Sequence, residues 1–152
     1  MDFPKHDRRS AQRPAVLITS VEVMLMHLLI VSMCGAIGCA LRLVARDVLM
    51  RNGAQPWWAV LVINLFGALL MGAVAGSAQS IEEQAGPMLV AAVTGVLAGW
   101  TTYSAFSMDV VQLWLRGQRA SALTLWAATL CGAPLLALAG RAAMAAYTGA
   151  PT

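Results

Sequence analysis

The sequence predicts an all-α integral membrane protein with four transmembrane helices. Hydrophobic residues make up 59% of the 152 positions and charged residues only 11%, a far more apolar composition than that of a soluble domain. The ten Lys and Arg residues lie almost wholly in short stretches that separate long apolar runs. A helix needs about 20 apolar residues to cross a hydrocarbon core of roughly 30 Å. The runs predict transmembrane spans at residues 23–44, 57–78, 87–115 and 120–140.

The chain divides into a tail and one membrane domain. Residues 1–22 are polar and basic, contain two prolines and show no sustained hydrophobic period, so we expect a disordered basic tail there. Residues 23–148 are expected to form a single four-helix domain. Its connections, including a loop at residues 79–86, are short, so neighbouring helices must run antiparallel. Met24 and Met26 are further candidate start sites, which leaves the presence of the tail open.

Several functional classes find no support in the charged and reactive residues. The net charge of +3 comes from basic residues in loops and tails, which is typical of topology control and lipid contact rather than nucleic-acid binding. Cys34, Cys39 and Cys131 lie inside apolar segments without CxxC or His-rich spacing, so they predict packing residues and no metal site. His27 and Asp109 lack the spacing of a nucleophile and its base, so we expect no enzyme.

Asn64 is the polar exception in the second predicted span. An unpaired amide in a hydrocarbon-like medium costs on the order of several kcal/mol, so this side chain must have a partner. One interpretation is an interhelical hydrogen bond that only stabilises packing. The other is a hydrogen-bond donor that faces a permeating ion, and the composition of the third span favours it.

The third predicted span carries a polar and aromatic segment from residue 94 to residue 107. It holds five Thr or Ser hydroxyls and three aromatic rings around a pair of small residues. Gly99 beside Thr101 and Thr102 weakens helix propensity, and Thr side chains compete for backbone partners, so we predict a break in this helix. Non-helical backbone at membrane depth is tolerated only inside protein or along a cavity. The carbonyls that such a break releases could bind a cation.

Two aromatic residues after the predicted break share one helical face. Tyr103 and Phe106 are three positions apart, and the edges of their rings are electropositive. A small anion could pass along these edges while the Asn64 amide and Ser or Thr hydroxyls replace its lost waters. No Lys or Arg lies in the segment, which favours transit of an anion over its capture. Side-chain packing is the alternative interpretation of the same pair.

These residues resemble a known family, the small bacterial fluoride channels called CrcB or Fluc. The resemblance covers residues 30–135 of the sequence and is carried by three motifs. They are a glycine-rich end of the first helix followed by arginine, an asparagine followed by glycines, and a segment similar to the family signature Gly-Gly-x-Thr-Thr-Phe-Ser-Thr-Phe-Ser. The matching residues are Gly35, Gly38, Arg42, Asn64, Gly67, Gly72 and the run Ala98–Ser107, which includes Gly99 and Thr102.

The resemblance implies an antiparallel dual-topology dimer in a bacterial cell inner membrane, with two fluoride pathways and one structural sodium ion, Na⁺, at the dimer interface. Such a protein exports cytoplasmic fluoride by passive permeation, and its partners are fluoride and membrane lipid, with no nucleic acid. By the same resemblance, the backbone carbonyls of Ala98 and Thr101 would hold the sodium ion. The residues implied along the fluoride pathway are Asn64, Tyr103, Ser104, Phe106 and Thr129.

The chain departs from the family pattern at several positions. Ala59 and Val60 stand in place of a Gly-Thr pair, Ala98 replaces a glycine, Tyr103 a phenylalanine and Ala105 a threonine. A homodimer is expected, but these changes leave open a heterodimer in which this chain is a non-conducting subunit. Two further alternatives are a small dual-topology multidrug-type transporter, which would want a carboxylate inside the membrane, and an assembly protein whose polar segment only packs.

Overall fold

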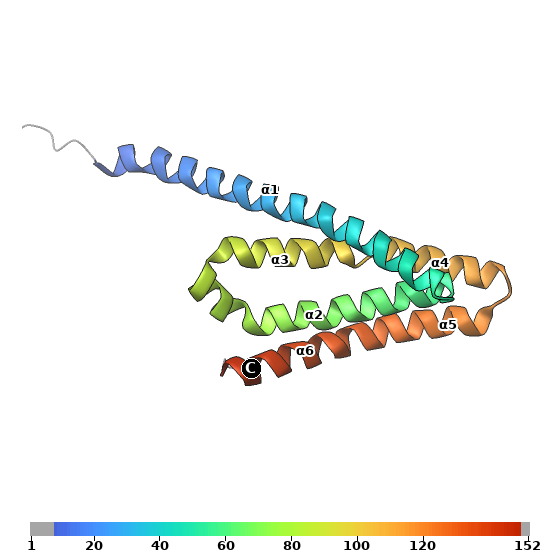
Figure 1. The fold of residues 1–152 in the computed structure, drawn as a ribbon. Helices are drawn as coiled ribbons and strands as arrows, with labels where there is room; N and C mark the ends of the chain where they lie inside the picture. The colour runs from blue at the N-terminus through green and yellow to red at the C-terminus, as the bar shows by residue number, and fades with distance from the viewer. Residues whose placement is uncertain (1–7, 150–152) are drawn as a thin grey trace, which may run out of the picture.

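The computed structural model of the protein describes the backbone of residues 8–149 and the side chains of residues 21–149, and the regular elements in that part are all helices. They form a bundle of long rods (Figure 1). The elements are α1 (Arg8–Arg51), α2 (Pro56–Ala85), α3 (Pro87–Trp100), α4 (Tyr103–Leu115), α5 (Arg119–Ala127), the short π-helix η1 (Ala128–Gly132) and α6 (Ala133–Thr148). Helical backbone angles at both ends of η1 join it to α5 and α6 as one rod.

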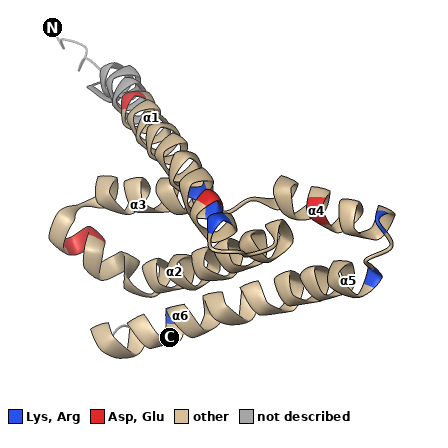
Figure 2. Cartoon of the chain, turned by 45° about the vertical axis from the view of Figure 1, so that its right-hand side comes forward, with Lys and Arg blue, Asp and Glu red and all other residues tan. Residues whose placement is uncertain are grey.

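Four segments of this bundle are long and apolar enough to cross a membrane, which confirms the predicted number of spans. They are Val21–Arg51, Pro56–Ala85, Pro87–Leu115 and Arg119–Thr148. Figure 2 shows that most charged residues lie towards the ends of these segments, while α3 carries none. Charges at the ends and apolar residues between them suit a chain that crosses a membrane four times.

The helices extend beyond the predicted span boundaries. α1 runs on to Arg51, and α2 runs to Ala85 through the predicted loop at residues 79–86. A helix gains one hydrogen bond for each residue added, and the predicted loop contains no glycine or proline before Gly86. Gly86 ends α2 with a φ of 81°, a conformation that favours glycine. The helices are thus longer than predicted, while the number of spans is as predicted.

The predicted tail also differs from the structure. α1 begins at Arg8, so the backbone of residues 8–22, where we expected disorder, is helical. The span that starts at Val21 supplies the costly first turn, and the helix then propagates towards the amino terminus. Residues 1–7 of the predicted tail lie outside the described residues.

Helix α2 lies at the centre of the bundle. It packs against α6 on one side and α3 on another, while α1 packs on α3 (Figure 1). Small residues make these contacts close, because a Cβ atom at Gly72 of α2 would overlap the carbonyl of Ala137 in α6. A Cβ atom at Gly38 of α1 would likewise overlap the carbonyl of Val96 in α3. Two of the motif glycines therefore serve close helix packing.

A buried apolar cluster joins α2, α4 and α5 and holds α4 on α2. It consists of Val60, Leu61, Phe106, Leu113, Ala122 and Leu125. Phe106 belongs to the cluster with an exposed fraction of 3%, so the first turn of α4 is anchored to α2. This anchor brings the segment between α3 and α4 close to Asn64.

Candidate functional site

Helix α3 ends at Trp100 and α4 begins at Tyr103, with two threonines in extended conformation between them. Thr101 has a φ of −82° and a ψ of 153°, and Thr102 has a φ of −151° and a ψ of 123°. The Thr102 hydroxyl accepts a hydrogen bond of 3.3 Å from the N–H of Ala105 and so caps the amino end of α4. The extended backbone of the two threonines thus ends α3, and the Thr102 hydroxyl caps the start of α4.

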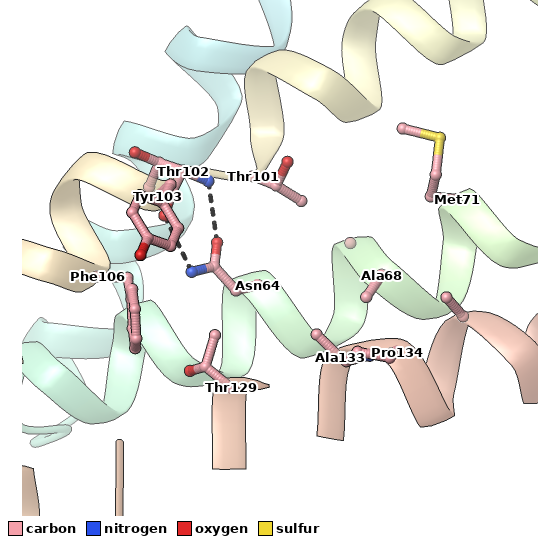
Figure 3. Close-up of a pocket in the computed structure, with 12 residues that line it drawn as sticks. Asn64, Ala68, Met71, Thr101, Thr102, Tyr103, Phe106, Thr129, Ala133 and Pro134 are labelled. Carbon is pink, nitrogen blue, oxygen red and sulfur yellow. Dashed lines mark hydrogen bonds between the residues drawn. The ribbon is translucent and has the colours of Figure 1, made fainter. Parts of the chain in front are cut away.

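Asn64 of α2 pairs with the backbone of Thr102 across the helix interface (Figure 3). Its amide nitrogen donates to the Thr102 carbonyl at 3.2 Å, and its amide oxygen accepts from the Thr102 N–H at 3.0 Å. The side chain is 7% exposed, and the partner that burial requires is therefore the backbone of Thr102. The amide nitrogen carries a second hydrogen, so the role of Asn64 as an ion-facing donor stays a prediction beside its packing role.

Trp100 is a residue of this site that sequence reasoning missed. Its indole nitrogen donates a hydrogen bond of 3.0 Å to the carbonyl of Ile63, one residue before Asn64. The indole ring also meets the ring of Phe66 edge on, with the ring centroids 6.5 Å apart. An indole N–H in the middle of an apolar span needs an acceptor, and that need is the signal that could have singled out Trp100.

A groove of about 410 Å³ lies beside the two threonines, between α2, the start of α4, η1 and α6 (Figure 3). It brings together predicted residues from separate helices, namely Asn64, Gly67, Thr101, Thr102, Tyr103, Phe106 and Thr129. The remaining lining residues are Ala68, Met71, Ala133, Pro134 and Ala137. The groove is therefore mainly apolar, with a few polar groups gathered near Asn64, which is the usual composition of a site for a small ligand.

Thr129 reaches the groove from η1. Its hydroxyl oxygen is buried and has no hydrogen-bond partner within the part of the chain that the structure describes. A buried polar group without a partner destabilises a fold, and single turns of π-helix recur at functional sites. Thr129 therefore lines the groove with a side chain whose hydroxyl oxygen is covered by neighbouring atoms and keeps an unused hydrogen-bonding capacity.

The two predicted aromatic residues meet at the groove, with ring centroids 5.5 Å apart and ring planes inclined at 51°. Their environments differ, because Phe106 is buried in the apolar cluster whereas Tyr103 is 75% exposed. Phe106 is thus held rigidly by its neighbours in the bundle. Tyr103 stands on a side of the groove that the chain itself leaves uncovered.

Other predicted residues lie away from the groove. Ser104 does not line it, and its hydroxyl oxygen lies 3.1 Å from the hydroxyl oxygen of Thr102. Gly38 and Gly99 lie in the contact between α1 and α3. Arg42 belongs to α1, and its Nε atom is buried without a partner among the described residues. The role of Ser104 in the fluoride pathway stays a prediction.

The two carbonyl groups predicted to hold a cation flank the end of α3. In an unbroken helix the N–H of Thr102 would donate to the carbonyl of Ala98, but here it donates to Asn64. The hydroxyl of Thr101 lies 3.5 Å from the Ala98 carbonyl oxygen but closer, at 3.3 Å, to the carbonyl oxygen of Leu97, so it is at most a weak partner for Ala98. The residues described contain no group of three His, Cys, Asp or Glu that could hold a metal ion. Backbone oxygens at this point, which suit hard cations, fit the predicted kind of site.

A smaller pocket of about 160 Å³ near the turn between α4 and α5 was also missed by sequence reasoning. Asp109, Gln112 and Arg116 line it, together with Trp57, whose indole nitrogen donates to the Gln55 side chain at 2.7 Å. One carboxylate oxygen of Asp109 is buried without a partner in the described residues. The pocket marks a charged end of the bundle, at the level where tryptophans favour the membrane interface.

Known proteins resemble the chain over most of its length. The family model described as "CrcB-like protein, Camphor Resistance (CrcB)" matches residues 29–141. A protein of Rhizobium meliloti (strain 1021), named fluoride-specific ion channel FluC, is 38% identical over 121 residues, which cover 79% of this chain and 97% of the relative. A protein of Chelativorans sp. (strain BNC1) with the same name is 32% identical over 115 residues, 75% of this chain and 92% of the relative. These relatives are named as ion channels and not as enzymes. Because the family model covers most of the chain, the protein belongs to the CrcB-like protein family.

Proposed function

We propose that the protein is a fluoride-selective channel that lets cytoplasmic fluoride leave the cell by passive permeation through the inner membrane. The observation that carries the proposal is the groove in which Asn64, Phe106 and Thr129 meet from three different elements. The identity of the permeating ion is inferred from the relatives, because both proteins described above are named fluoride-specific ion channels.

The groups that line the groove suit the dehydration of a small anion. Fluoride that leaves water must find hydrogen-bond donors, and in this proposal one of them is the hydroxyl of Thr129, which has no partner among the described residues. The second hydrogen of the Asn64 amide is another, and the ring edges of Tyr103 and Phe106 add a weaker positive potential. No Lys or Arg lines the groove, so a passing anion meets no full positive charge that would trap it.

The pathway requires a second subunit in the opposite orientation. Tyr103 lines the groove and is largely exposed, which leaves that side of the groove without protein, and many large apolar side chains of α1 elsewhere on the bundle are exposed as well. A partner that covers this side would close the path and exclude lipid from it. In a homodimer the partner is a second copy of this chain. In a heterodimer it is a sister subunit that carries the hydroxyl missing at Val60.

The segment from α3 to α4 acts in this proposal as one membrane span with a break at its middle. Pro87–Leu115 is long enough to cross a bilayer, and Thr101 and Thr102 interrupt its helix. Irregular backbone at that depth must be buried in protein or line a polar cavity. The dimer interface provides such an environment for Thr101 and Thr102.

A structural sodium ion completes the proposal. The carbonyls of Ala98 and Thr101 are the groups that would hold it, since the break removes the helical partner of Ala98. When bound, sodium supplies a positive charge that stabilises the irregular backbone of two subunits. A Gly-to-Ala change at position 98 is compatible with this role, because a carbonyl ligand uses no side chain.

A multidrug-type transporter is the second candidate that the sequence left open. Such a protein would use a carboxylate inside the membrane, and Asp109 has a buried carboxylate oxygen without a partner among the described residues. Asp109 lies in the small pocket near the α4–α5 turn and not in the large groove. The groove and the relatives favour the fluoride channel over this alternative.

Fluoride efflux from liposomes tests the proposed function. The purified full chain is reconstituted, the liposomes are loaded with potassium fluoride, and release is started with a potassium ionophore and followed with a fluoride electrode. We expect rapid fluoride release and no release of chloride from matched liposomes. Chloride is cheaper to dehydrate, so its exclusion has to come from a narrow path. Equal leakage of the two anions would rule the proposal out, and release only after addition of a sister subunit would identify a heterodimer.

A further inference from the structure

A tryptophan that the proposed pathway does not use stands at the break between α3 and α4. Trp100 donates its indole N–H to the carbonyl of Ile63 at 3.0 Å, and its ring packs edge on against Phe66. Resting on the function proposed above, we infer that Trp100 is a positioning residue of the cation site. It holds the carbonyls of Ala98 and Thr101 in the arrangement that a sodium ion needs.

The extended segment is fastened to α2 at two points. Ile63 and Asn64 are consecutive residues of α2, and they bind Trp100 and Thr102, the two neighbours of Thr101. The Asn64 side chain makes two hydrogen bonds to the backbone of Thr102, whereas the Ile63 carbonyl accepts one from the indole of Trp100. Thr101 is therefore held on both sides, and the direction of its carbonyl is set by both contacts together.

Helix α2 leaves space for the indole ring of Trp100. Gly67 lies one turn after Ile63, and a Cβ atom there would come within 2.9 Å of the Trp100 ring and 2.5 Å of the Thr101 methyl group. Both distances are too short for real atoms, so only glycine leaves room for the indole in this position. The contact between Trp100 and α2 is thus a close packing arrangement as well as a hydrogen bond.

Trp100 is close in the chain to both carbonyl groups that are proposed as cation ligands. Trp100 lies between Ala98 and Thr101, so a rotation of its peptide moves the carbonyls on both sides. Holding ligands in place before an ion binds lowers the ordering cost of binding and raises affinity. Loss of one hydrogen bond of ordinary net strength corresponds to a roughly two- to tenfold change in an equilibrium constant. We expect a change of this size in sodium affinity when the indole N–H is removed.

The first test observes the indole of Trp100 in the intact protein. The full chain is labelled with ¹⁵N in its five tryptophan side chains, and sodium chloride is titrated against choline chloride at constant ionic strength. The other four indoles are assigned by single Phe substitutions, which leaves Trp100 by elimination. The Trp100 peak should shift with sodium and saturate, while the peak of Trp126, an exposed residue of α5 that does not line the groove, should stay in place. A Trp100 peak that ignores sodium overturns the inference.

The second test removes the donor and keeps the ring. In Trp100→Phe, we expect the sodium concentration that gives half of the sodium-dependent rise in thermal unfolding temperature to increase roughly two- to tenfold. The matched control, Trp126→Phe, should leave that concentration unchanged. An unchanged sodium response in Trp100→Phe overturns the inference. If this variant does not fold, the sodium titration of the Trp100 indole peak in the parent protein is the test of the inference.

The outcomes separate this inference from the proposed function. A parent protein that passes fluoride but shows no sodium response in either measurement overturns the inference and leaves the fluoride pathway standing. A parent protein whose Trp100 peak responds to sodium, but which passes no fluoride with any partner, supports the inference and overturns the proposed function.

Discussion

The side chain of Asn64 binds both backbone polar groups of Thr102, donating to the carbonyl at 3.2 Å and accepting from the N–H at 3.0 Å. This pair of hydrogen bonds satisfies both backbone polar groups of Thr102, as a neighbouring strand would in a sheet. The backbone can therefore be non-helical at Thr102 inside the bundle. Asn64 therefore links the groove and the break in one contact.

Asn64→Asp should abolish fluoride efflux. The aspartate loses the N–H that donates to Thr102 and, when ionised, repels both the Thr102 carbonyl and an arriving anion. We expect the free energy of unfolding to fall by about 1–3 kcal/mol, since a buried group loses its partner. Ser77→Ala is the control, because the Ser77 hydroxyl is buried in the same helix but bonds to Ala73 of that helix. Full efflux by Asn64→Asp would show that the amide is not needed for permeation.

Phe106→Ile should abolish efflux while the protein stays folded. The change removes a ring edge from the groove and also leaves space in the apolar cluster, so we expect a loss of about 1–3 kcal/mol in stability. Leu113→Val is the matched control, because Leu113 belongs to the same cluster but does not line the groove. The control should lose stability and keep efflux. Transport by Phe106→Ile at the parent rate would contradict the ring-edge mechanism.

Tyr103→Phe should leave efflux unchanged or raise it. The phenol oxygen is the only group removed, and Tyr103 is 75% exposed, so stability should change by less than about 0.5 kcal/mol. Efflux in liposomes and thermal unfolding measure the two effects. Tyr147→Phe, at a tyrosine of α6 that is 85% exposed, serves as the reference. A strong loss of efflux in Tyr103→Phe alone would assign the phenol a role as a hydrogen-bond donor to the ion.

Thr129→Val should lower efflux roughly two- to tenfold, the change expected for the loss of one hydrogen bond of ordinary net strength. The two side chains have nearly the same shape, and the Thr129 hydroxyl lacks a partner among the described residues. Stability should therefore stay the same or rise. Thr124→Val is the control, because Thr124 is exposed on α5 and does not line the groove. If Thr129→Val keeps the parent rate, the hydroxyl does not serve the ion.

The orientation of the chain can be tested by cysteine labelling. With four spans, one side of the membrane receives Lys5, Arg8, Arg9, Arg13 and Arg141, and the other receives Arg42, Arg46, Arg51, Arg116 and Arg119. Equal numbers give no strong bias, so we expect insertion in both directions, as an antiparallel homodimer requires. Gln118→Cys, exposed in the α4–α5 turn, is introduced in a background without the three native cysteines. Labelling from both sides of the membrane is the expected result. Labelling from one side only would require a sister subunit of opposite orientation, as would a start of translation near Met24.

The sequence by itself determined the class of protein, the number of membrane spans and the location of the polar segment. Apolar runs of about 20 residues separated by short polar stretches predict helices, which satisfy their own backbone polar groups in lipid. The need of Asn64 for a partner followed in the same way, because a lone amide is too costly in an apolar span. The lengths of the helices were underestimated, since propagation past the hydrocarbon core leaves no hydrophobic signal.

The tertiary structure alone decided which groups meet. The partner of Asn64 is the backbone of Thr102, and the acceptor for Trp100 is the carbonyl of Ile63, and neither atom has a side-chain signature in the sequence. Thr129 enters the groove from a turn of π-helix, whereas Ser104 is turned to the Thr102 hydroxyl. Each of these contacts depends on the rotation and height of one helix against another. Packing of small residues fixes that rotation and height, and hydropathy does not encode them.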